Sequence, residues 1–245
     1  MGLFDRFMGP KPPKAAPRNA VAAKWADRVE KRAQNYDRQE AIAALAELAN
    51  EDAAEVLLKR FTFQIDPSIT DQEEKDAAYR GVLRAGREAV APVRAFAAKA
   101  ESLAWPMRIA KEILPEEEYV GELLQWLSKW DTEYAKFIDP KVQILAALEE
   151  KRDPRIREQV ERFLEDVNEP ARFHAASTLL AQGDAAAGPA LVNLLIEEES
   201  VRVRNRVADG FATRGWTVSA DQRDAARKAL PSPFTVDGAG RVVKR

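Results

Sequence analysis

Few residues of this chain have the types and spacing that catalysis or metal binding requires. The 245 residues include no cysteine and a single histidine, His174. Zinc sites of the usual kind use cysteine and histidine ligands, so a metal centre here would consist almost entirely of carboxylates. The sequence contains no Gly-rich phosphate loop, nucleophile elbow or His-Glu-x-x-His pattern. We therefore predict no catalytic residue, no metal site, no cofactor and no enzymatic activity, and either a structural or a solvent-facing role for His174.

Two groups of carboxylates are candidates for acid–base chemistry, and we propose neither as a catalytic pair. Glu116, Glu117 and Glu118 follow Pro115 at the start of an expected helix, where negative charge complements the helix dipole. Trp130-Asp131-Thr132-Glu133-Tyr134 resembles the start of the Trp-Asp-x-x-Asp element of HEAT-like alkylpurine DNA glycosylases. Tyr134 stands where that family has its catalytic carboxylate, so the resemblance fails at the residue that matters.

The net charge of -2 is unevenly distributed. Residues 1–35 carry eight Lys or Arg against three Asp or Glu, and residues 200–245 carry ten against four, which leaves the middle near -13. An acidic middle repels phosphate, so we do not expect nucleic acid as a partner. The basic ends are either merely solvated or in contact with an anionic partner.

The candidate recognition residues are aromatic and basic. Trp126 and Trp130 are four residues apart, hence on one face of a helix, where they form either a packing ridge or an exposed patch. Arg202, Arg204 and Arg206 occupy alternate positions, so at least one guanidinium must be exposed. We take Arg202 and Arg206 as partner-binding candidates.

Residues 1–15 form a separate segment. A short helix at its start cannot continue past Gly9, because the run from Gly9 to Lys14 contains three prolines. Its apolar tip, on one helical face, consists of Leu3, Phe4, Phe7 and Met8. Such a tip is an anchor for a membrane interface or for a partner; the alternatives are an ordinary chain start and packing on the first repeat. Arg6 occupies the position where myristoylation requires Ser or Thr, so lipidation is not expected.

The elements that position these residues are helices, since helical periodicity runs almost unbroken over residues 16–230. One motif returns: a basic residue, then small or apolar residues three, four and seven positions later. It is found at Arg172-Ala175-Ala176-Leu179 and Arg204-Val207-Ala208-Phe211, and more loosely at Arg38-Ala41-Ile42-Leu45 and Lys75-Ala78-Tyr79-Val82. Such self-similarity is typical of a solenoid, whose units bury their apolar faces against one another.

The pattern predicts a leading helix over 16–34, with Val21, Trp25 and Val29 as its apolar stripe. Six helix pairs follow, over 37–49 with 51–64, 71–85 with 88–101, 104–113 with 116–130, 140–150 with 154–166, 170–181 with 185–197, and 200–213 with 219–229. Met107 and Gln143 stand in the third and fourth pairs where the motif has a basic residue, so the register between 104 and 150 is open by about a turn.

Residues 168–215 carry a family resemblance. Asn168-Glu169-Pro170-Ala171-Arg172-Phe173-His174-Ala175-Ala176, then Gly183-Asp184 and the run 189–195, resemble a HEAT repeat, and Val201-Arg202-Val203-Arg204 opens the next unit similarly. The resemblance implies a right-handed superhelix of antiparallel helix pairs that binds other macromolecules. It also implies that Arg172 and Arg204 tie neighbouring units together through acidic residues.

Residues 231–245 place a Gly-containing turn between β-prone segments, which predicts either a small capping hairpin or a flexible basic tail. We therefore expect an all-α solenoid of about six helix pairs with residues 1–15 and 231–245 at its ends. Because no apolar run reaches the roughly 18 residues of a membrane span and no secretory signal is found, we expect a cytoplasmic protein, peripheral to the membrane if its tip anchors there. The predicted function is a non-enzymatic scaffold or adaptor for another protein. The alternatives are a HEAT-like phycobilin-lyase-type chaperone and a HEAT-like DNA glycosylase or nucleic-acid-binding protein.

Overall fold

The computed structural model describes residues 20–245. The predicted anchor residues Leu3, Phe4, Phe7 and Met8 therefore lie outside the described residues. The described chain contains thirteen α-helices, five short 3-10 helices and one two-stranded sheet, which confirms the all-α prediction. None of these helices is long and apolar enough to cross a membrane. The chain divides into two compact units, with the boundary between Val93 and Arg94.

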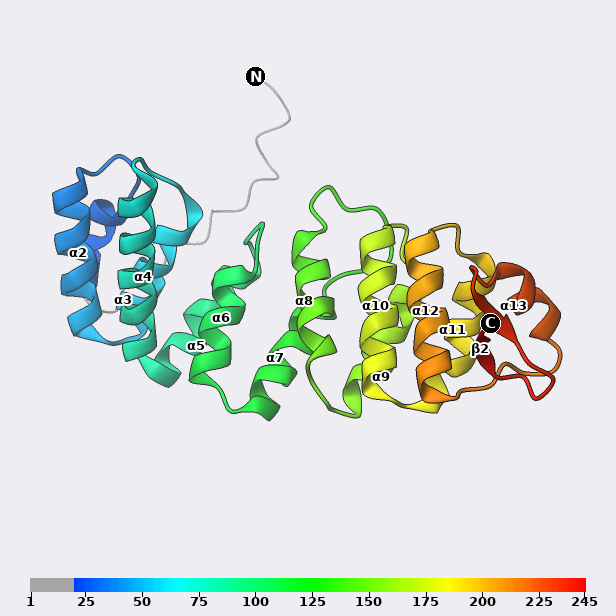
Figure 1. Ribbon diagram of the computed structural model, residues 1–245. Helices are drawn as coiled ribbons and strands as arrows, with labels where there is room; N and C mark the ends of the chain where they lie inside the picture. The colour runs from blue at the N-terminus through cyan, green and yellow to red at the C-terminus, as the bar shows by residue number, and fades with distance from the viewer. Residues whose placement is uncertain (1–19) are drawn as a thin grey trace, which may run out of the picture. The chain divides into compact units, whose positions relative to one another are not determined.

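The N-terminal unit contains α1 (Ala20–Ala26), α2 (Asn35–Leu48), α3 (Glu51–Leu58) and α4 (Ser68–Arg84), and α5 (Val90–Ala97) begins in it. In Figure 1, α2 and α4 lie side by side, and α3 packs against both. The leading helix ends at Ala26 and not at residue 34 as predicted. Of its expected stripe, Val29 is fully buried but Val21 is 49% exposed, because Ala22 takes the buried position.

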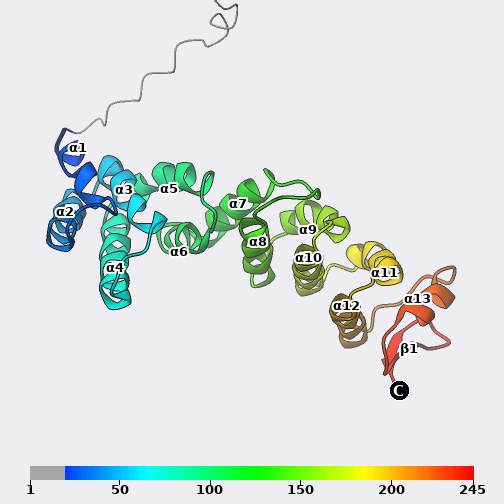
Figure 2. The same cartoon turned by 90° about the horizontal axis from the view of Figure 1, so that it is seen from above.

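The C-terminal unit contains the remaining helices, which are α6 (Ala104–Ile113), α7 (Glu116–Leu127), α8 (Asp139–Glu149), α9 (Arg155–Val160), α10 (Glu169–Gln182), α11 (Gly188–Glu197), α12 (Val201–Arg214) and α13 (Arg223–Ala229). Figure 1 shows α8, α10 and α12 side by side, and Figure 2 shows α9 and α11 forming a second row behind them. The 3-10 helices are η1 (Asp27–Val29), η2 (Lys59–Thr62), η3 (Gly86–Ala89), η4 (Glu161–Glu165) and η5 (Ala185–Ala187).

The predicted C-terminal hairpin is present. β1 (Phe234–Val236) pairs antiparallel with β2 (Val242–Lys244), with Val236 opposite Val242. Both valines are buried, and the strands contact α12 and α13. The hairpin therefore covers the last helices of the unit.

Glycines and prolines mark the helix bounds for the expected reasons. Gly183 and Gly215 follow α10 and α12 with φ of 75° and 66°, the left-handed conformation that closes a helix. Pro140 and Pro170 lie in the first turns of α8 and α10, where a missing N–H costs nothing.

Neighbouring helices approach closely at one recurring position. A Cβ added to Gly81 of α4 would lie 2.9 Å from Ala46 Cβ of α2. A Cβ added to Gly210 of α12 would likewise lie 2.9 Å from Leu180 Cγ of α10. Both glycines follow the basic residue of their motif by six positions, and Thr178 has that position in α10. Small residues at this position set the spacing between helices.

The basic residues of the motif are ion-pair partners at the helix starts. Arg172 Nε donates to Glu198 Oε2 at 2.7 Å, and Lys141 Nζ lies 2.5 Å from Asp166 Oδ2 with both side chains fully buried. Burial alone would raise the pKa of Glu198, but hydrogen bonds, chiefly from Arg172, lower it. Arg204 differs from the expectation, because within residues 20–245 its guanidinium donates to the backbone carbonyls of Glu199 and Ala229 and forms no ion pair with an acidic side chain.

These contacts settle the register of the third and fourth pairs. Lys141, not Gln143, has the basic position of α8, and the side chains three, four and seven positions later are the fully buried Ile144, Leu145 and Leu148. In α6 the equivalent residue is Pro106, not Met107, followed by the buried Ile109 and Ala110. The expected positions were off by two residues and by one.

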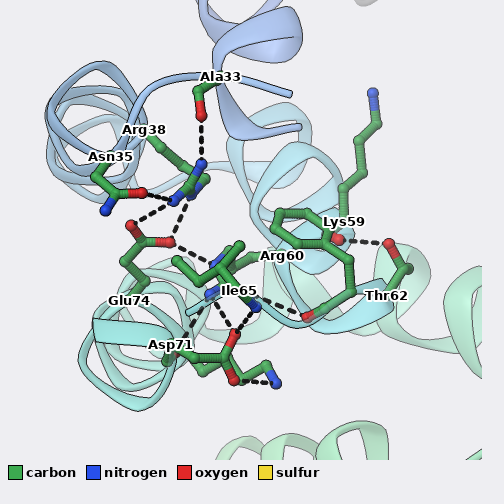
Figure 3. Close-up of polar contacts among 11 residues, drawn as sticks. Ala33, Asn35, Arg38, Lys59, Arg60, Thr62, Ile65, Asp71 and Glu74 are labelled. Atoms are coloured by element: carbon green, nitrogen blue, oxygen red, sulfur yellow. Dashed lines mark hydrogen bonds and ion pairs between the residues drawn. The ribbon is translucent and has the colours of Figure 1, made fainter. Parts of the chain in front are cut away.

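The N-terminal unit holds its ion pairs in a larger buried network (Figure 3). The Glu74 carboxylate lies between two guanidinium groups, accepting from Arg38 Nε at 2.6 Å and from Arg60 Nε at 2.7 Å. Arg60 Nη2 also donates to Asp71 Oδ1 at 2.7 Å, and Lys75 Nζ donates to Asp71 Oδ2 at 2.6 Å. Arg38 and Arg60 are 1% and 0% exposed, so this network ties α2, η2 and α4 together inside the core.

Candidate functional site

An apolar groove of about 530 Å³ lies in the C-terminal unit, and we call it the aromatic groove. It is formed by the chain after α5, the end of α7, the connection over residues 128–138 and the start of α8. Its larger apolar lining residues are Leu103, Trp126, Trp130, Phe137 and Pro140. Its charged lining residues are Lys99, Glu101, Lys129 and Lys136. The structure thus brings together the two tryptophans that the sequence singled out.

The two tryptophans do not share a helical face, contrary to the prediction. Helix α7 ends at Leu127 and not at residue 130, so Trp130 belongs to the connection that follows. Trp126 is 4% exposed and packs in the core, whereas Trp130 is half-buried. Trp126 Nε1 is a buried donor with no acceptor among residues 20–245. Buried donors of this kind are rare in folded proteins.

The connection that carries Trp130 is held by hydrogen bonds to its backbone. Arg162 Nη2 donates to Trp130 O at 2.7 Å, and Lys141 Nζ donates to Asp131 O at 3.2 Å. Val167 N donates to Thr132 O at 3.0 Å. These donors come from α8, η4 and the chain after η4, so the rest of the unit fixes the position of Trp130 before any partner arrives.

The opposite wall is fixed by a side chain of α8. Gln143 Oε1 accepts from Leu103 N at 2.6 Å, and Gln143 Nε2 donates to Ser102 Oγ at 3.0 Å. Beside it, Arg94 of α5 donates from Nε to Glu122 of α7 at 3.0 Å, and this hydrogen bond is the main reason that the pKa of Arg94 is raised. Both walls of the groove are therefore preorganised.

The groove combines accessible aromatic surface with positive charge. Phe137 is 48% exposed, and Lys136 Nζ lies 4.9 Å from the centre of its ring. Within the described chain, Lys99, Lys129 and Lys136 form no ion pair with a carboxylate. Their charge is therefore available to a partner.

Arg202 and Arg206, the other predicted binding residues, lie away from this groove on α12. The Arg202 guanidinium stacks 3.7 Å from the centre of the Phe173 ring, and its side chain is 54% exposed. Arg206 Nε donates to Ser177 Oγ at 2.7 Å, and its Nη2 donates to Glu149 Oε1 at 3.2 Å. Arg206 is thus tied to α10 and α8, and Arg202 is the more accessible of the two.

The remaining candidate residues for catalysis or metal binding do not form a common site among the described residues. His174 packs edge-on against Phe173, and burial is the main cause that lowers its pKa. No three His, Asp or Glu side chains of the described chain are grouped to hold a metal ion. Tyr134 is 80% exposed and does not line the aromatic groove.

A second hollow, of about 1130 Å³, lies against α9, η4 and α11. Its lining is strongly acidic, with carboxylates from Glu158, Glu161, Glu165, Asp166, Glu197, Glu198 and Glu199 against three arginines. Arg172 is already paired with Glu198, and Arg157 with Glu161 and Asp184. A surface of this charge repels phosphate groups.

Comparison of the sequence with protein-family models and with curated proteins gives no match. The site is therefore interpreted from its own geometry. Sequence reasoning identified Trp126 and Trp130 but missed Phe137 and the lysines, because residues 128–138 show no helical or strand period. The one available signal was the number of aromatic and basic residues in that short connection.

Proposed function

We propose that this chain is a HEAT-like helical-repeat scaffold, a right-handed solenoid of antiparallel helix pairs, that binds another protein through the aromatic groove. The observation that carries this proposal is the meeting of Trp130, Phe137 and unpaired lysines in one preorganised groove. Tryptophan is among the residues that contribute most to the binding energy of protein interfaces, and aromatic residues as a group are enriched there.

Three features support the repeat architecture. The basic position recurs at residues 38, 75, 141, 172 and 204, each followed by buried residues at the same offsets. Close approach at Gly81 and Gly210 recurs at the same offset from it. Ion pairs at helix starts repeat in both units, as the resemblance to HEAT repeats implies for Arg172.

Protein is favoured over nucleic acid as the partner. The acidic hollow at α9 and α11 and the charge of about -13 in the middle of the chain oppose phosphate. The carboxylate that a glycosylase requires is replaced by Tyr134, which is exposed on the connection. We further propose a cytoplasmic location, with Leu3, Phe4, Phe7 and Met8 as an anchor to a partner or to the membrane surface. Liposome co-sedimentation with and without residues 1–15 tests that anchor, and equal pelleting of the two forms rejects it.

Affinity purification from the native host tests the scaffold proposal. We expect a co-eluting protein that is retained by the Tyr134→Ala variant and lost with Trp130→Ala. Tyr134 is the matched control, because it is an aromatic residue of the same connection outside the groove. The same co-eluting proteins with all three forms would reject the groove as the binding surface.

A chromophore chaperone of the phycobilin-lyase type is the second candidate. The observation in its favour is that an apolar groove of about 530 Å³ lies within the range of small-molecule sites, roughly 300–1,000 Å³. Mixing the protein with a bilin separates the two functions. A visible absorbance shift that Trp130→Ala abolishes would favour the chaperone, and an unchanged spectrum excludes it.

A further inference from the structure

We infer that the aromatic groove recognises an extended acidic segment of a partner protein. Such a segment places one aromatic or large aliphatic side chain between Trp130 and Phe137 and sets Asp or Glu residues on either side of it. The inference rests on the proposed function and specifies the chemistry of the partner.

The positive charge of the lining residues indicates that the bound segment of the partner is negatively charged. Lys99 follows α5, and Lys129 and Lys136 both lie in the connection over residues 128–138, so two segments of the chain contribute three ammonium groups. Glu101 is the sole carboxylate among the lining residues. Because these lysines have no carboxylate partner in the described chain, an acidic segment gains three attractions without breaking an existing pair.

The apolar part of the lining determines the anchor. Trp130 is half-buried and Phe137 is 48% exposed, so both rings keep accessible surface that an apolar side chain can cover. The volume of about 530 Å³ suits one or two large side chains and is too small for a folded element such as a helix pair.

A peptide fits these conditions better than a nucleic acid does. A nucleic acid carries one phosphate at every nucleotide. A strand that stacked on Trp130 would therefore bring phosphates close to Asp131 and Glu133, two exposed carboxylates of the same connection that repel them. A peptide confines its charge to the few residues beside the lysines. The groove therefore selects carboxylates close to one apolar anchor.

Selection from a random 12-residue peptide library on the full-length protein tests this inference. We expect enriched peptides to combine a Phe, Trp or Leu with at least two Asp or Glu, and we expect no enrichment on Trp130→Ala. The best peptide is then fluorescein-labelled and titrated by anisotropy. Three exposed charge pairs together contribute roughly tenfold in affinity, so the triple variant Lys99→Gln/Lys129→Gln/Lys136→Gln should weaken binding about tenfold.

Controls separate the inference from the function on which it rests. Lys111→Gln removes an exposed lysine outside the groove and should leave the affinity unchanged. If the enriched peptides are neutral or basic and their enrichment depends on Trp130, the acidic partner is overturned while the peptide-binding groove is supported. Enrichment that ignores Trp130, or none at all, would overturn both. A labelled dT12 strand that outcompetes the best peptide in the groove would replace protein with nucleic acid.

Discussion

Removal of Glu74 should destabilise the N-terminal unit far more than removal of an exposed glutamate in an equivalent ion pair. Glu74 accepts three hydrogen bonds from guanidinium groups, two from Arg38 and one from Arg60. Both arginines are almost fully buried, at 1% and 0% exposure. With Glu74→Ala, Arg38 keeps only the oxygens of Ala33 and Asn35 as acceptors and loses its sole carboxylate.

The magnitude follows from the charge that is left behind. Breaking a buried ion pair from one side costs about 3–5 kcal/mol, because an uncompensated charge remains in the core. Arg60 retains Asp71, so we expect the lower to middle part of this range, about 3–4 kcal/mol. Glu74→Gln keeps the shape and one acceptor oxygen, and its cost should be smaller.

The matched control is Glu47→Ala. The Arg84–Glu47 pair also joins α4 to α2, at 2.6 Å, but its side chains are 53% and 70% exposed. Exposed pairs contribute about 0.2–1 kcal/mol, so this variant should be nearly neutral.

The assay is hydrogen exchange on the full-length protein, read on peptides from α2 and α4, because two units need not unfold together. Urea unfolding followed by circular dichroism provides a second measure. If Glu74→Ala and Glu47→Ala lower protection by similar amounts, the network contributes no more than surface charge, and the reasoning is wrong.

Three further predictions concern packing and pH. Gly210→Ala should lower stability by about 1–3 kcal/mol through the clash with Leu180, whereas Gly188→Ala, whose Cβ meets open space, should be neutral or slightly stabilising in thermal melts. Burial alone would raise the pKa of Asp71, but hydrogen bonds from basic side chains lower it to about 2 from 3.8. Its stabilisation, at most about 2 kcal/mol, is present above pH 4 and is lost as the pH falls toward 2; Asp71→Asn should remove this dependence from acid unfolding curves. Burial, with the nearby Glu116 charge, raises the pKa of Tyr119 to about 12 from 10, so stability should fall between pH 10 and 12. The difference in absorbance at about 295 nm between wild type and Tyr119→Phe follows that phenol, and a midpoint near 10 would contradict the assigned burial.

The sequence was sufficient for the helices and for most of their pairing. Apolar periodicity and the glycines and prolines between helices are local signals, so the expected pairs match α2 to α13 within a few residues at most ends. The largest errors fall where local signals are weak. The leading helix ends at Ala26 and not at residue 34, and α3 and α9 each end six residues before their predicted ends, where a short 3-10 helix follows.

The buried ion pairs were harder to predict because their partners lie far apart in sequence. Arg38 meets Glu74 over 36 positions, and Lys141 meets Asp166 over 25. Lys141 is also unusual, because lysine is among the residue types that are least often fully buried. The motif was nevertheless satisfied from Lys141, with apolar residues at each later offset.

The aromatic groove lies where the repeat departs from its own pattern. In α6, Pro106 stands where the motif has a basic residue. The connection from α7 to α8 spans eleven residues, 128–138, whereas three residues link η4 to α10 and α11 to α12. That longer connection supplies Trp130, Lys136 and Phe137 to the groove. Local rules that hold along the rest of a chain are expected to fail where function replaces packing. The segment that departs from the repeat pattern is thus the same segment that forms much of the groove that we propose as the binding site.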